Sequence, residues 1–104
     1  MQGIGGVLYE EMVYDEHGQP LSGSFMDYAM PLATQAPPIV LDHIENLSTR
    51  NPLGVKGLGE GGAIAPPAAI ANAVEDALRP LGVIIRRGPL TPARVLELIH
   101  KAQK

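Results

Sequence analysis

Glycine and proline constrain this chain more than any other feature of its sequence. The 12 glycines and 10 prolines account for 22 of its 104 residues, which is roughly twice the average usage of about 12%. They follow no period, so collagen and repeat arrays are excluded. They gather at 3–6, 31–38 and 51–67. Because loop backbone carries polar groups that need partners, we expect this turn-rich chain to be part of a larger protein.

The composition excludes several classes of protein. Hydrophobic residues make up 45% and charged residues 18%, a globular mixture that is not typical of disorder. No apolar run approaches the roughly 18–20 residues needed to span a bilayer, and no segment resembles a signal peptide. The absence of cysteine excludes disulfides, thiolate metal sites and a cysteine nucleophile.

Charge is unevenly distributed along the chain. The first 50 residues carry seven acidic side chains and one basic one, whereas the remainder carries seven basic and four acidic side chains. The basic residues are scattered, and only three tyrosines and one phenylalanine are present. A nucleic-acid-binding surface, with basic side chains along the phosphate backbone and aromatic rings that stack on bases, is therefore not predicted. We expect no nucleic-acid partner.

Local patterns predict an α+β or α/β fold, a small mixed sheet with two to three flanking helices. The clearest helix begins at Pro66 and stops at Pro80 and Gly82, and the last helix is capped by Thr91. A short helix is expected from the N-terminus through Glu11. Strands are expected at 12–15, 39–44 and 83–85, with 21–30 partly extended. Residues 1–104 are predicted to form a single subdomain.

The segment from Gly57 to Gly62 fits the pattern G-x-G-x-x-G. A dinucleotide-binding fold is not favoured, because no buried strand precedes the loop and no acidic residue lies about 20 residues further on. A glycine loop can still let the backbone approach a ligand closely. Glu60 is then either a carboxylate displayed toward a substrate or a cap on the helix that begins near Ala65. Both interpretations stay open at this point.

Other catalytic residue types lack the spacing that their chemistry needs. His17, His43 and His100 show no metal-ligand spacing, so a zinc or iron site held by the protein is not predicted. The serines lack the G-x-S-x-G motif, so a serine hydrolase is not predicted either.

The string from Asn51 to Gly62, NPLGVKGLGEGG, resembles the C-terminal signature of the molybdenum hydroxylase large chains. This is the family of xanthine dehydrogenase, aldehyde oxidoreductase and aerobic carbon monoxide dehydrogenase, and the resemblance is strongest to the carbon monoxide dehydrogenase branch. Supporting stretches occur in the family's order at 2–5, 8–11, 23–28 and 66–73. The chain is thus similar to a C-terminal part of a larger molybdenum-cofactor-binding domain.

The resemblance implies roles for individual residues. Glu60 corresponds to the family's active-site glutamate, which acts as base toward the hydroxo ligand of molybdenum. The metal is held by a pterin cofactor rather than by protein side chains. The residues that the resemblance places at the cofactor are Gln2, Gly3, Lys56, Gly57 and Gly59.

The resemblance also implies cofactor and partners. The complete enzyme is expected to hold molybdenum–molybdopterin, with a cytosine dinucleotide tail as one option, and the isolated chain to hold none and to be inactive. Expected partners are the remainder of the large chain, iron–sulfur and FAD subunits or domains, and a small-molecule substrate (carbon monoxide, an aldehyde or a heterocycle) in the cytoplasm. The alternative is a non-catalytic binding or assembly module with the same fold.

Overall fold

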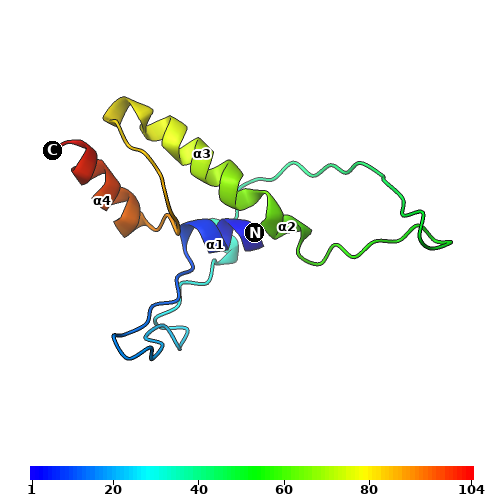
Figure 1. Cartoon of the computed structure of the whole chain (residues 1–104), viewed down its shortest axis with the longest axis horizontal. Helices are drawn as coiled ribbons and strands as arrows, with labels where there is room; N and C mark the ends of the chain where they lie inside the picture. The colour runs from blue at the N-terminus through cyan, green and yellow to red at the C-terminus, as the bar shows by residue number, and fades with distance from the viewer.

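The computed structural model describes residues 1–104, and helices form its ordered centre. The first helix packs against the second and third, and the last helix leads into the C-terminus (Figure 1). None of these helices combines the length and the apolar character needed to cross a bilayer. In chain order the elements are α1 (Gln2–Leu8), the 3-10 helix η1 (Ala33–Gln35), α2 (Gly61–Ile64), α3 (Pro66–Leu78), the 3-10 helix η2 (Arg79–Leu81) and α4 (Pro92–Ala102).

The predicted helix after the paired prolines is confirmed as α3. Pro66 and Pro67 occupy its first positions, where the missing backbone N–H has no intrahelical acceptor to lose. The chain then passes through η2 to Gly82, whose φ of 73° lies in the left-handed region that glycine adopts without strain. Local residue chemistry therefore sets both ends of this helix.

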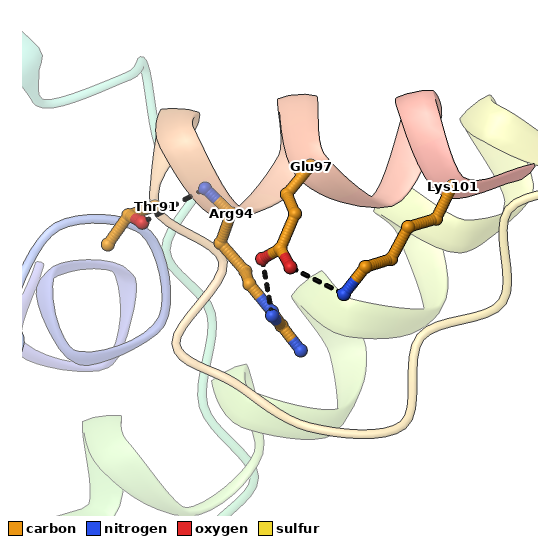
Figure 2. Close-up of polar contacts among 4 residues, drawn as sticks. All are labelled: Thr91, Arg94, Glu97 and Lys101. Atoms are coloured by element: carbon orange, nitrogen blue, oxygen red, sulfur yellow. Dashed lines mark hydrogen bonds and ion pairs between the residues drawn. The ribbon is translucent and has the colours of Figure 1, made fainter.

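The last predicted helix is confirmed as α4. The Thr91 hydroxyl accepts a hydrogen bond from the Arg94 backbone N–H at 3.4 Å, as expected of an N-cap residue. Along the helix, the Glu97 carboxylate accepts from the Lys101 ammonium and from the Arg94 guanidinium, the latter at 2.6 Å (Figure 2). Hydrogen bonds from Lys101 and then from Arg94 lower the pKa of Glu97 below its ordinary value.

The first helix is shorter than predicted. It ends at Leu8 rather than at Glu11. The backbone N–H groups of Tyr9 and Glu10 both donate to the Gly5 carbonyl oxygen, at 3.0 and 2.9 Å. The second of these bonds spans five residues, so the last turn widens and the chain leaves the α-helical path. The glycines at its start already weaken this helix.

The predicted small mixed sheet is wrong, and with it the α+β or α/β class. The chain is helical with long irregular segments. Its one β-type backbone pairing is an isolated antiparallel bridge between Tyr14 and Pro20. Residues 39–44 have strand-like sequence but no backbone hydrogen bond to any other part of the chain. A strand requires a partner strand, and this chain does not supply one. Residues 12–15 and 83–85 likewise form no strand.

Two long arms extend from the helical centre, residues 9–32 after α1 and residues 36–60 before α2 (Figure 1). The radius of gyration is 17.7 Å, compared with about 13 Å for a compact domain of this length. Only 6 of 104 residues are buried, and Val7, Val83 and Leu90 form the small apolar core. The Leu90 N–H donates to the Val7 carbonyl oxygen at 2.6 Å, which ties the segment before α4 to α1.

Candidate active site

Glu60 lies at the junction between the second arm and α2. Its backbone carbonyl accepts a hydrogen bond from the Ala63 N–H at 2.9 Å, which makes Glu60 the N-cap residue of the helix. Its exposed side chain makes no capping hydrogen bond and joins none of the four ion pairs in the structure. Glu60 therefore stands at a helix start, where the helix dipole favours an acid, but no side-chain bond within this chain holds its carboxylate.

The glycines before Glu60 border open space. A Cβ atom added to Gly57 or Gly59 would meet no atom within 4 Å, and neither residue has a positive φ. Neither backbone strain nor packing inside this chain therefore requires glycine at these two positions. Close approach of another molecule or chain segment to the bare backbone is a physical reason for glycine there.

The N-terminus of α1 reaches the same region. Gln2 is exposed at the first position of the helix, whereas Gly3 is buried. A Cβ on Gly3 would overlap the Pro66 ring and lie 2.7 Å from the Gly62 carbonyl oxygen. Since Gly62 belongs to the short helix that Glu60 begins, the structure brings the Gln2–Gly3 end of the predicted site close to Glu60.

Lys56 is held within the second arm. Its ammonium donates to the Asn46 side-chain oxygen at 3.1 Å. The Asn51 side chain closes the adjacent turn by bonding to both the N–H and the carbonyl of Val55, at 3.0 and 2.9 Å. The structure thus places Lys56 on an internally braced loop, where its side-chain hydrogen bond is to Asn46 and not to α1.

Sequence reasoning missed two contacts that organise the helical centre. One is the packing of Pro66 on Gly3 described above. The other joins α3 to the segment before α4, where the Glu75 carboxylate accepts from the Ile85 N–H at 2.6 Å. Each joins residues that are not neighbours on one helix, so helical spacing could not reveal it.

The arrangement suits proton transfer more than metal ligation by the protein. No group of three histidine or carboxylate side chains lies close enough to hold a metal ion. What the region offers is one unpaired carboxylate beside an uncovered glycine backbone and the exposed Gln2. A carboxylate in such a position can take a proton from a reacting group held within hydrogen-bond distance.

Comparison with known proteins identifies related chains. Residues 1–37 match a family model described as a molybdopterin cofactor-binding domain. The chain is 50% identical over 108 residues to the 6-hydroxypseudooxynicotine dehydrogenase complex subunit gamma of Paenarthrobacter nicotinovorans, a match that covers 100% of this chain and 14% of that relative.

Solved structures show the same fold. Quinoline 2-oxidoreductase from Pseudomonas putida 86 superposes with a TM-score of 0.86 at 42% identity, over 96% of this chain and 13% of that one. Reconstituted CO dehydrogenase from Oligotropha carboxidovorans superposes with a TM-score of 0.79 at 30% identity, over 92% of this chain and 12% of that one. The chain spans no more than 14% of the length of these three relatives.

Proposed function

Because this chain belongs to the family of molybdenum-binding large chains of the molybdenum hydroxylases, we propose that it supplies the base of an oxidoreductase active site and part of the site that binds the cofactor. The observation that carries the proposal is the exposed, unpaired carboxylate of Glu60 between an uncovered glycine loop and the N-terminus of α1. The Glu60 carboxylate makes no hydrogen bond or ion pair within this chain, which leaves both of its oxygens available to a reacting group.

The proposed reaction oxidises a substrate with water and releases two electrons and two protons. The molybdenum–molybdopterin cofactor, when bound, supplies the redox chemistry that accepts the electrons. Glu60 accepts one of the protons at a carboxylate oxygen, which is general base catalysis. Its exposure in this chain leaves that oxygen accessible to a molecule seated against the loop.

The residues near Glu60 fit a cofactor that brings its own metal ligands. Gly57 and Gly59 leave the backbone N–H groups approachable, and such groups bind anionic or polar cofactor edges. Gln2 offers an exposed amide at the first position of α1, and Lys56 offers a cation on the braced loop. We propose Gln2, Gly3, Lys56, Gly57 and Gly59 as the part of the cofactor site that this chain provides.

The substrate class that we favour is a nitrogen heterocycle. The chain shares 42% identity with quinoline 2-oxidoreductase and 30% with CO dehydrogenase, so its sequence is nearer to the enzyme named for a heterocycle. Turnover of quinoline and not of carbon monoxide by the complete enzyme would support this choice, and the reverse would overturn it.

The whole enzyme is proposed to include further components. These are the remainder of the large chain and subunits or domains that carry iron–sulfur clusters and FAD.

The cofactor has two candidate forms, with and without a cytosine dinucleotide tail, and nucleotide analysis of the loaded enzyme separates them. A cytoplasmic location stays a prediction.

The test is the substitution Glu60→Gln in the complete enzyme. It should lower turnover by about 10²-fold or more, the scale of general base catalysis, while molybdenum content stays at the unaltered level. Glu45→Gln is the matched control, because Glu45 is also exposed on the second arm and joins no ion pair. Turnover that survives Glu60→Gln would favour the alternative, a non-catalytic binding or assembly module.

A further inference from the structure

The three glycines of α1 occupy different steric environments. A Cβ on Gly3 would overlap the Pro66 ring and the Gly62 carbonyl. A Cβ on Gly5 would lie 2.7 Å from Pro31 Cγ and 2.9 Å from a Glu10 carboxylate oxygen, whereas on Gly6 the nearest atom is 3.9 Å away. Glycine costs about 1 kcal/mol relative to alanine inside a helix. At Gly3 and Gly5 that cost is offset, because a larger residue would overlap neighbouring atoms.

Gly3 is the point where α1 touches the helices that follow the glycine loop. Its missing side chain lets the α1 backbone lie directly on the Gly62 carbonyl and on the Pro66 ring. Gly62 sits in the four-residue helix α2 that begins immediately after Glu60, and Pro66 begins α3. The separation between α1 and the segment that carries Glu60 is therefore set at Gly3.

We propose that Gly3 is a positioning residue for the base. By fixing how closely α1 approaches α2, it holds the Glu60 carboxylate at its working distance from whatever molecule Gln2 and the glycine loop bind. The inference rests on the proposed function of Glu60, and it assigns Gly3 an action through packing. An added methyl group would push α1 and α2 apart and displace Glu60.

The experiment uses the complete enzyme and three single substitutions, Gly3→Ala, Gly5→Ala and Gly6→Ala. Gly3→Ala should lower kcat per molybdenum by about 10- to 100-fold, since displacement of a reacting group by about 1 Å has an effect of that size. KM should stay within about twofold, because substrate binding does not depend on the base.

The two other variants separate positioning from general stability. Gly5→Ala creates a clash with Pro31 and Glu10 instead of with Gly62 and Pro66, because residues two apart on a helix lie on different faces, so it should lower Tm while kcat per molybdenum stays unchanged. Gly6→Ala adds a methyl group whose nearest neighbour is a Glu10 carboxylate oxygen at 3.9 Å, so it should leave kcat per molybdenum unchanged and raise Tm slightly, because alanine favours a helix more than glycine does. Equal losses of kcat in Gly3→Ala and Gly5→Ala, or no loss in Gly3→Ala, would overturn the proposal.

Pro66→Ala tests the contact between Gly3 and Pro66 by changing the second residue. Added to Gly3→Ala, it removes the ring atom Cγ that lies nearest the new methyl group, whereas the Cβ of residue 66 and the Gly62 carbonyl oxygen stay close, so only part of kcat should return. If the Gly3→Ala enzyme fails to fold or to bind molybdenum, Pro66→Ala alone decides: a loosened contact should lower kcat several-fold at full metal content, and an unchanged kcat would overturn the inference. Glu60→Gln is measured in parallel, because an inactive Glu60→Gln enzyme beside a normal Gly3→Ala enzyme refutes the positioning role alone, whereas an active Glu60→Gln enzyme refutes both.

Discussion

Individual glycines in this chain serve opposite steric purposes. Gly3 is buried and allows two helices to touch, whereas Gly57 and Gly59 leave backbone uncovered. Sequence reasoning could point to Glu60 and the glycine loop because they form one continuous motif. It could not find the contact between Gly3 and Pro66, because a contact between distant parts of the chain leaves no local pattern.

The uncovered loop makes a prediction for Gly59→Ala in the complete enzyme. A methyl group there meets nothing within the chain, so stability should change by no more than about 0.5 kcal/mol. Molybdenum content should fall, because the methyl group occupies the space that the cofactor is proposed to approach. Metal analysis and thermal unfolding measure the two effects. Gly23→Ala is the control, since Gly23 also faces open space but lies on the first arm; equal metal content in both variants would contradict the prediction.

Helices were predictable in this chain because their signals are local. Pro66 at the start of α3, Gly82 after its end and Thr91 at the cap of α4 each act within one turn of the backbone. The run at 39–44 was not predictable in the same way. Its β-branched residues favour extended backbone, but a sheet depends on a partner that the sequence pattern of one segment cannot supply.

The ion pairs of α4 predict a pH effect. The pKa of Glu97 is lowered by hydrogen bonds from Lys101 and Arg94, so the folded chain holds this proton less tightly than the unfolded chain does. The stabilising contribution is therefore present above the ordinary glutamate pKa of about 4.3 and is lost as the pH falls through the lower folded value. An NMR titration of the Glu97 carboxyl carbon should show a titration midpoint below the ordinary pKa of a glutamate side chain.

Two variants check the cause of that shift. Lys101→Gln with Arg94→Gln should raise the Glu97 midpoint toward its ordinary value. Lys104→Gln removes a charge that makes no ion pair with Glu97 and should leave the midpoint in place. An unchanged midpoint in the double variant would contradict the assignment.

The whole molecule is open rather than compact. Several large apolar side chains are almost fully exposed, including Met26 at 96%, Val40 at 96% and Ile44 at 95%. The same open arrangement superposes on a much longer solved chain with a TM-score of 0.86. The high glycine and proline content predicted this need for external support, but the shape of the arms depends on contacts that no local pattern encodes.

This openness predicts the behaviour of the chain when it is produced alone. Without surrounding protein, Glu60 and the glycine loop are exposed to solvent on the side that would face the cofactor. A cofactor bound there would contact only this one surface. The purified 104-residue chain should therefore contain no stoichiometric molybdenum and no activity, whereas the same segment within the complete large chain should contain the metal. One molybdenum atom per isolated chain, by elemental analysis, would contradict this prediction.

Both arms leave the helical centre and return to it (Figure 1). Doubling the length of a flexible loop costs only about 0.6 kcal/mol in closure entropy. Length changes in the first arm, or in residues 36–50 of the second arm ahead of the glycine loop, should therefore be tolerated while α1, α2 and α3 keep their arrangement. The chain can thus change the length of surface segments on either side of its helical centre without moving the junction that carries Glu60.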